Sequence, residues 1–191
     1  MEKIEVLLAT ADFITQNQTQ NAKKLIESRY KHEYRKYEKR EMSDFKKLEI
    51  FIKDGFIDRY TGRKLIFPNV LRIMSLELDE AFPFHSNWKM SDCHIAYWEF
   101  MPTYDHVIPI ARGGKDEGDN IVTTSQKMNS AKANFLLEEI GFQLFPAGDM
   151  KAWDGMINWY LEYIESKPKS LENEYLRNWD RALRKIGYSG T

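Results

Sequence analysis

Residues 103–134 of the chain read TYDHVIPIARGGKDEGDNIVTTSQKMNSAKAN, and this stretch decides the fold. Asp105 and His106 precede one short β-branched run, and Asn120 opens a second. Two such runs joined by a turn that contains a Gly-Gly pair predict a β-hairpin. A helix is predicted to begin near Ser125, so the stretch as a whole predicts a strand–strand–helix unit.

The polar residues of this stretch suit the hydrolysis of a phosphodiester. Asp105 offers a carboxylate oxygen and Asn129 an amide oxygen, and oxygen ligands are those that Mg²⁺ and Mn²⁺ prefer. Histidine titrates near pH ~6.5, so His106 is a candidate general base, held in position by Asn120 or a backbone carbonyl beside it. Lys132 lies three residues after Asn129, on the same helical face, and is a candidate for binding the phosphate.

The order Asp-His-Val-x-Pro, Gly-Gly, Asn-Ile-Val and Asn-x-x-Lys resembles the HNH endonuclease family of ββα-metal nucleases. The resemblance implies His106 as general base and Asn120 as the residue that orients it. It implies Asp105 and Asn129 as the ligands of one divalent cation. The last motif position is often histidine in the family, so this chain resembles an HNN variant.

The resemblance covers residues 104–132 strictly, and 61–133 if the turn Tyr60-Thr61-Gly62-Arg63 matches the turn before the motif. Many relatives carry two Cys-x-x-Cys pairs that bind a structural zinc ion. The corresponding positions, 60–63 and 125–128, contain no cysteine, and Cys93 is the single cysteine of the chain. No structural zinc is therefore expected. Packing is expected to hold this region instead, with the aromatic insertion 69–101 as the candidate partner.

Composition sets broad limits on the class of protein. The chain has 191 residues, of which 42% are hydrophobic and 30% charged, with a net charge of −1. These values are ordinary for a globular protein and argue against disorder. No apolar run approaches the ~18 residues of a membrane span, and the N-terminus does not resemble a signal peptide, so a cytoplasmic location is expected.

The net charge conceals a local excess of basic residues. Residues 18–40 contain eight Lys or Arg and three Glu, an excess of five positive charges, so the remainder carries about −6. Two interpretations stay open: a solvated helix face, or a face that contacts phosphates through Lys31, Arg35 and Lys39. A second helix is predicted to begin at a cap near Ser43.

The flanking segments predict further elements. Short strands are expected at 65–67, 75–79 and 95–100. The helix that begins near Ser125 is expected to end at Gly141. Apolar spacing predicts two C-terminal helices, of which the second has Ser170 as a plausible N-cap and ends at Gly187.

These patterns predict an α+β fold in which a ββα-metal core is flanked by N- and C-terminal helices. The expected regions are 1–54, helical; 55–141, the nuclease core with its insertion; and 142–191, helical. The expected function is cleavage of DNA, in the manner of a restriction or defence nuclease. Two alternatives stay open, an inactive nucleic-acid-binding module and a nuclease that acts on RNA. The sequence is compatible with a homodimer but does not indicate one.

Overall fold

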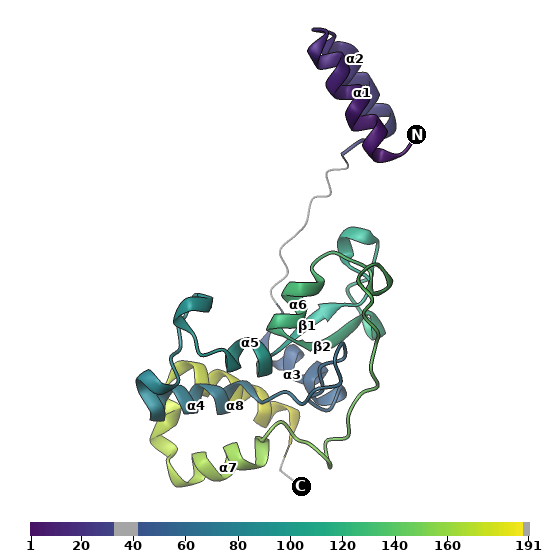
Figure 1. The fold of residues 1–191 in the computed structure, drawn as a ribbon. Coiled ribbons are helices and arrows are strands. Elements are labelled where there is room, and N and C mark those ends of the chain that lie inside the picture. Colours follow the sequence, from purple (N-terminus) through teal and green to yellow (C-terminus); the bar gives the residue numbers. More distant parts are fainter. Residues whose placement is uncertain (33–41, 189–191) are drawn as a thin grey trace. The chain divides into compact units, whose positions relative to one another are not determined.

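The computed structural model describes residues 1–32 and 42–188, and it combines helices with one small sheet in an α+β architecture (Figure 1). The chain divides into two compact units, Met1–Arg40 and Glu41–Thr191. This division differs from the expected boundaries at 54 and 141. Helix α3 (Asp44–Lys53) packs on the last helix and on both strands, which joins the middle and C-terminal regions into one unit.

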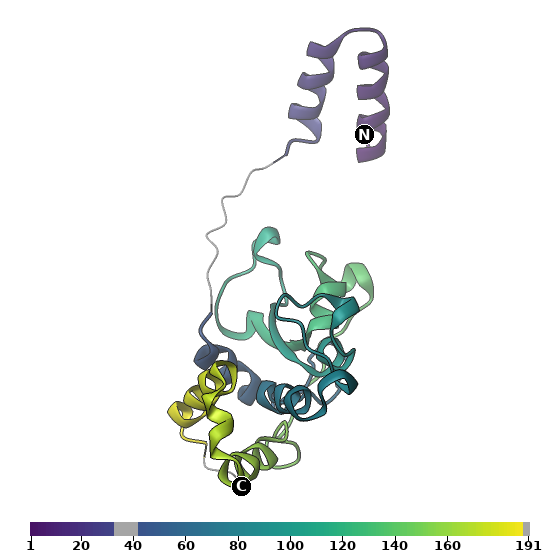
Figure 2. The ribbon, with the colours of Figure 1, turned by 90° about the vertical axis from the view of Figure 1, so that its left-hand side faces the viewer.

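The smaller unit is a helical hairpin. Helix α1 (Lys3–Thr15) and helix α2 (Thr19–Arg29) are joined by a short turn at 16–18 and lie side by side (Figure 2). Asn17 takes a positive φ in this turn, a conformation that asparagine tolerates better than most residues. The predicted helical character of the N-terminal region is confirmed for both α1 and α2.

The larger unit contains the remaining elements. Its α-helices and strands follow in the order α3, α4 (Pro68–Leu78), α5 (Ala96–Phe100), β1 (Pro102–His106), β2 (Ile121–Ser125), α6 (Gln126–Lys132), α7 (Ile157–Ser166) and α8 (Glu174–Ile186). Short 3₁₀ turns lie at Asp79–Ala81, Met90–Asp92, Ile110–Arg112, Gly118–Asn120, Leu137–Ile140 and Pro168–Glu172. Figures 1 and 2 both show the strands and α6 at one end of this unit and α7 and α8 at the other.

The predicted strand–strand–helix unit is confirmed. Strands β1 and β2 pair antiparallel with His106 opposite Ile121 and Pro102 opposite Ser125. Ser125 caps α6, because its Oγ accepts a hydrogen bond from the Met128 N–H at 3.2 Å. The helix ends at Lys132 instead of Gly141, since Ala133 takes a positive φ that interrupts it. Residues 102–132 are called the ββα unit below.

Helices α3, α4, α7 and α8 enclose the main hydrophobic core of the larger unit. Its most buried aromatic residues are Phe51, Phe56, Phe67 and Tyr160. The apolar stripes of the two C-terminal helices are therefore packing surfaces, as predicted. Helix α8 does end at Gly187, but its N-cap is Asn173 and not Ser170, because residues 168–172 form a 3₁₀ turn.

Three predicted strands are wrong. Residues 75–79 belong mainly to helix α4, which Pro68 opens at its first turn, where proline is favourable. Residues 96–100 form α5, and 65–67 form no strand. The aromatic insertion packs on α4, where Phe82, Phe84 and Trp88 surround Tyr97. Short apolar runs of this kind do not distinguish a strand from a buried helix.

Across residues 1–32 and 42–188, no helix is both long and apolar enough to cross a membrane.

Candidate functional site

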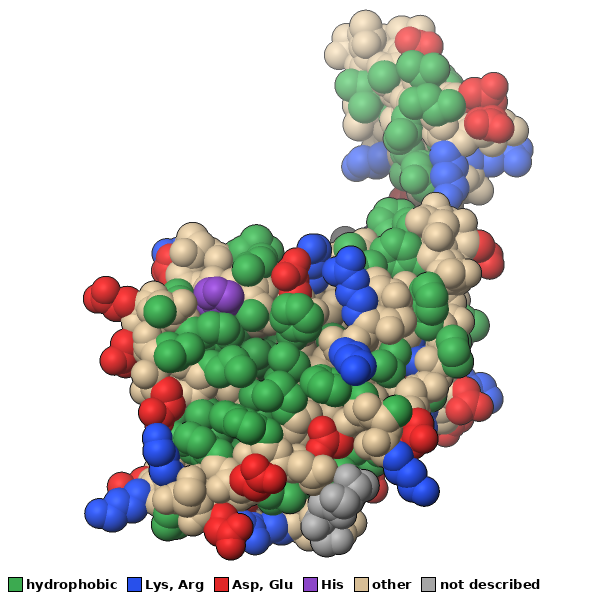
Figure 3. Space-filling view, turned by 60° about the horizontal axis from the view of Figure 1, so that its bottom comes forward, with side chains coloured by type: hydrophobic (Ala, Val, Ile, Leu, Met, Phe, Trp, Pro, Cys, Tyr) green, Lys and Arg blue, Asp and Glu red, His purple; other side chains and the backbone are tan. Residues whose placement is uncertain are grey.

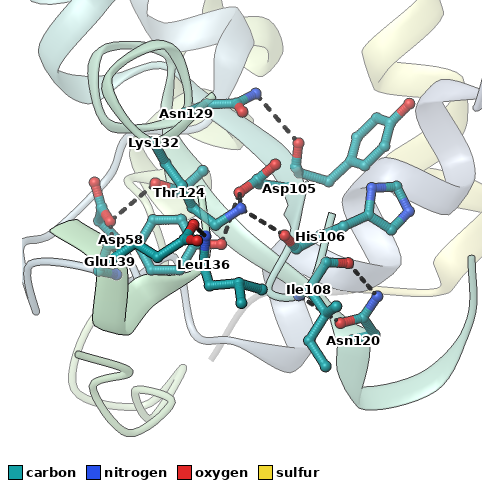
Figure 4. Close-up of polar contacts among 12 residues, drawn as sticks. Asp58, Asp105, His106, Ile108, Asn120, Thr124, Asn129, Lys132, Leu136 and Glu139 are labelled. Carbon is teal, nitrogen blue, oxygen red and sulfur yellow. Dashed lines mark hydrogen bonds and ion pairs between the residues drawn. The ribbon is translucent and has the colours of Figure 1, made fainter. Parts of the chain in front are cut away.

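Strand β1 ends with the two residues that were predicted to carry the chemistry. Successive strand residues point to opposite faces, and Figure 4 shows the His106 ring directed away from the Asp105 carboxylate. Asp105 faces α6 and the turn at residue 60, whereas His106 faces the loop that joins β1 to β2. The two side chains therefore have separate sets of partners, although they are neighbours in sequence.

Asp105 is held by a buried ion pair and a hydroxyl. Its Oδ2 lies 2.8 Å from Lys132 Nζ and accepts a hydrogen bond of 2.7 Å from the Tyr60 hydroxyl. Burial, reinforced by the negative charge of Asp105, raises the pKa of Tyr60, so this hydroxyl stays protonated and remains a donor. Both contacts fall on Oδ2, and Oδ1 has no hydrogen-bond partner within the described residues.

The predicted role of Lys132 in binding phosphate is corrected by this arrangement. The Lys132 side chain is 0% exposed, and its ammonium also donates to the His106 carbonyl oxygen at 2.7 Å. Removing one partner of a buried ion pair is costly because it strands the other charge. Lys132 therefore stabilises the end of β1 and the position of Asp105, and its charge is not available to a phosphate.

Asn129 lies next to β1, as its predicted role requires. Its Nδ2 donates a long hydrogen bond of 3.5 Å to the carbonyl oxygen of Tyr104, the residue before Asp105 (Figure 4). This contact uses the amide nitrogen. The amide oxygen is therefore left as the group that can bind a cation beside Asp105.

The partner of the His106 ring is Asp116. His106 Nε2 lies 2.8 Å from Asp116 Oδ1, and the His106 side chain is 18% exposed. A carboxylate only accepts hydrogen bonds, so this contact fixes the proton on Nε2 and leaves Nδ1 as an acceptor. The predicted contact between Asn120 and the His106 ring is not observed, and Asp116 occupies that role.

Asn120 instead organises the loop between the strands. Its side-chain Oδ1 accepts a hydrogen bond of 2.8 Å from the Ile108 N–H. Its Nδ2 donates hydrogen bonds to the carbonyl oxygens of Ile108 and Lys115, at 3.0 and 2.7 Å. The loop closes so tightly that a Cβ on Gly114 would lie 1.8 Å from the Ile108 oxygen. The backbone carbonyl oxygen of Asn120 also accepts a hydrogen bond from the Val107 N–H. Asn120 therefore fixes the backbone next to His106 and does not contact its ring.

We expect Asn120→Asp to loosen this loop without unfolding the protein. The variant keeps the acceptor for Ile108 but loses both donors and places a carboxylate against two carbonyl oxygens, with each lost hydrogen bond costing about 0.5–1.5 kcal/mol. Hydrogen exchange should show faster exchange at Ile108 and Val107, with unchanged protection in helix α8. Asp119→Asn, an exposed exchange one residue away, is the matched control. Equal protection in Asn120→Asp and wild type would contradict this assignment.

The positions of the missing cysteine pairs are joined by a buried carboxylate. Asp58 is 1% exposed, and its Oδ1 accepts from the Tyr60 N–H at 3.0 Å and the Thr124 hydroxyl at 3.1 Å. Its Oδ2 accepts from the Ser125 N–H at 3.0 Å. Asp58 thus ties the turn at 58–63 to the start of α6. The aromatic insertion, which was expected to hold this region, also contacts it, through α5 on α6 and β2.

A second buried carboxylate extends this connection. Asp54 is fully buried, pairs with Arg59 at 2.6 Å and accepts from the Thr123 N–H at 2.6 Å. The Arg59 N–H in turn donates to the Thr123 carbonyl oxygen. The two acidic side chains therefore fix β2 against the segment that follows α3.

The donor set fits a weakly liganded divalent cation. Asp105 Oδ1 and Asn129 Oδ1 are hard oxygen donors, and Mg²⁺ commonly takes one or two protein ligands and fills the rest with water and phosphate. Within the residues that the structure describes, no group of three or more His, Cys, Asp or Glu side chains could hold a metal ion. Asp105 and Asn129 remain candidate ligands on the chemistry of their oxygen atoms alone.

The predicted phosphate-binding residues of the N-terminal region lie apart from this site in the sequence. Lys31 is exposed just after α2, whereas Arg35 and Lys39 lie outside the described residues. The proposed phosphate contacts of all three remain a prediction.

Three site residues were not predicted: Tyr60, Asp58 and Asp116. Tyr60 lies 45 residues before Asp105, and Asp58 lies further back still, so no local spacing connects either residue to the motif. Asp116 follows the glycine pair within the motif, and its distance of ten residues from His106 across a hairpin loop was the available signal.

The resemblance to HNH endonucleases is carried by the short motif at 104–132. Its residues lie on two strands, their connecting loop and one helix. Over the chain as a whole, no family model, no curated protein and no solved structure matches.

Proposed function

We propose that this protein is a metal-dependent endonuclease of the HNH type that hydrolyses phosphodiester bonds in DNA. The observation that supports this most is the pair of contacts at the end of β1. There a carboxylate orients the His106 ring, and Asn129 bonds to the carbonyl oxygen of Tyr104, the residue before Asp105, whose Oδ1 has no hydrogen-bond partner among the described residues. A general base and two hard oxygen donors are thus carried by one ββα unit, which would form the ββα-metal core.

In this mechanism His106 takes a proton from water at Nδ1, because Asp116 holds the proton on Nε2. The water oxygen bonds to phosphorus, the bond from phosphorus to the leaving oxygen breaks, and the leaving oxygen gains a proton from solvent. A divalent cation, when bound by Asp105 and Asn129, supplies positive charge beside the phosphate oxygens. The ion pair with Lys132 fixes the Asp105 carboxylate in place.

The test is cleavage of supercoiled plasmid by the purified chain with Mg²⁺ or Mn²⁺. We expect nicked or linear product with either ion, and less cleavage of a single-stranded RNA of matched sequence. Absence of cleavage on every substrate would reject the proposal in favour of a binding module. Preferential cleavage of RNA would replace DNA as the substrate.

Removal of the metal should separate activity from folding. EDTA should stop cleavage but leave the melting temperature almost unchanged, because a site with two protein ligands contributes little to folding. Added Mg²⁺ or Mn²⁺ should restore cleavage at once, without a refolding step. Circular dichroism and elemental analysis provide the controls. Unfolding in EDTA together with one tightly bound zinc per chain would contradict this prediction.

A further inference from the structure

Two buried donors hold the Asp105 carboxylate in one orientation. Tyr60 is 4% exposed and Lys132 0%, and both donate to Oδ2, at 2.7 and 2.8 Å. A carboxylate oxygen has two lone-pair sites, so these two donors fill the acceptor capacity of Oδ2. Oδ1 has no hydrogen-bond partner among the described residues. Asp105 therefore presents one oxygen atom, and not two, to a cation.

Packing keeps the Tyr60 ring against Asp105. The centre of the Phe142 ring lies 6.1 Å from that of Tyr60, and Lys132 Nζ lies 5.7 Å from the same ring centre. The Tyr60 N–H bonds to the buried Asp58, which fixes the backbone of this residue. Burial raises the pKa of Tyr60, so its hydroxyl stays protonated. The hydroxyl is therefore a permanent donor to Oδ2.

Divalent cations differ in the oxygen ligands that they need. Mg²⁺ demands nearly octahedral coordination, keeps several waters and takes few protein ligands. Ca²⁺ takes about six to eight oxygen atoms, and a carboxylate can supply it with both of its oxygens. One carboxylate oxygen of Asp105 and one amide oxygen of Asn129 suit an ion of the first kind. They deprive Ca²⁺ of a chelating carboxylate.

We propose that Tyr60 sets the cation selectivity of this site, because its hydroxyl occupies Oδ2 of Asp105 and prevents chelation of Ca²⁺ by both carboxylate oxygens. The proposal rests on the proposed function, since it concerns the cation of that reaction. Tyr60 acts through Asp105 and is a positioning residue. Its effect should therefore appear in the binding of cations, even where no DNA is present.

Binding of Mn²⁺ to the full chain tests this without cleavage. Electron paramagnetic resonance measures free Mn²⁺, and competition by added Ca²⁺ gives the ratio of the Ca²⁺ and Mn²⁺ dissociation constants. Wild type should bind Mn²⁺ in preference to Ca²⁺. Asp105→Asn should lose the bound Mn²⁺, which locates the ion at this carboxylate. A wild type that binds no Mn²⁺, or an Asp105→Asn that binds it equally well, would overturn the proposal.

Tyr60→Phe keeps the ring and removes only the hydroxyl. One lone pair of Oδ2 then becomes available, so Ca²⁺ gains a second oxygen of Asp105. We expect the ratio of the Ca²⁺ and Mn²⁺ dissociation constants to fall by about 3–10-fold, the equivalent of one net hydrogen bond. The melting temperature shows whether the variant is folded. An unchanged ratio in folded Tyr60→Phe would contradict the role of the hydroxyl.

Tyr160→Phe is the matched control, because it removes the same kind of contact elsewhere. The Tyr160 hydroxyl donates to the buried Asp180 at 2.9 Å. Tyr160 lies on α7, at the end of the larger unit that Figure 3 turns toward the viewer, whereas Asp105 lies on β1 at the other end. Both tyrosine variants should lose thermal stability, but only Tyr60→Phe should change the ratio. An equal change in Tyr160→Phe would reject a specific role of Tyr60.

Plasmid cleavage separates this proposal from the proposed function. A chain that cuts DNA with Mn²⁺, but whose ratio is the same in wild type and Tyr60→Phe, would lose the selectivity role and remain a nuclease. A chain that shows the expected change in ratio, but cuts no nucleic acid, would keep the cation site and lose the nuclease function.

Discussion

His106→Ala is expected to lower the rate of DNA cleavage by about 10²–10⁴-fold, the usual loss when a general base is removed. His106 is the ring at the site whose Nδ1 is left as an acceptor, since Nε2 pairs with Asp116. The fold should persist, because the ring contacts Tyr104 and Asp116 and belongs to neither hydrophobic core cluster of the described residues. The measurement is initial plasmid cleavage at saturating Mg²⁺, with DNA affinity and melting temperature followed in parallel.

Two controls separate a general base from a structural residue. Added imidazole should restore part of the rate of His106→Ala, because it can accept a proton in the vacated space, whereas a purely structural loss would not respond. His85→Ala removes a histidine of the aromatic insertion and should cut at the wild-type rate. Cleavage by His106→Ala at the wild-type rate would contradict the mechanism, because His106 would then not be the general base.

The ββα unit could be predicted because its signals are local. β-Branched residues, the glycine pair and the Ser125 cap each favour the same structure within a few residues, and the strand pairing follows from them. The alternation of β1 likewise predicts that Asp105 and His106 face different partners. Local preferences of this kind predict the structure correctly when the tertiary fold favours the same conformation.

The burial of Lys132 could not be predicted, because it depends on residues far away in the sequence. Tyr60 covers the ammonium, whose nitrogen lies 5.7 Å from the centre of its ring, and Asp105 balances its charge. A lysine on a helix is normally exposed, so helical periodicity favours the opposite assignment. The strands predicted in the aromatic insertion are wrong for a similar reason. Its short apolar runs pack on α4, and this tertiary contact favours helices and turns over strands.

Asp58→Ala is expected to lower the free energy of unfolding of the larger unit by about 3–5 kcal/mol. The substitution leaves the Tyr60 and Ser125 N–H groups and the Thr124 hydroxyl without their acceptor, and each unsatisfied buried donor costs about 1–3 kcal/mol before relaxation. For a domain of this size the melting temperature should fall by about 10 °C. Thermal unfolding monitored by circular dichroism measures this.

A graded series makes the Asp58 prediction specific. Asp58→Asn can keep one oxygen facing Tyr60 and Thr124 but turns an amide nitrogen toward the Ser125 N–H, so its melting temperature should fall between those of Asp58→Ala and wild type. Asp119→Ala, at an exposed position, should melt like wild type. Added zinc should not raise the melting temperature of any variant, because the carboxylate joins the segments 60–63 and 125–128 by hydrogen bonds. Equal melting of Asp58→Ala and wild type would show that packing alone holds these segments together.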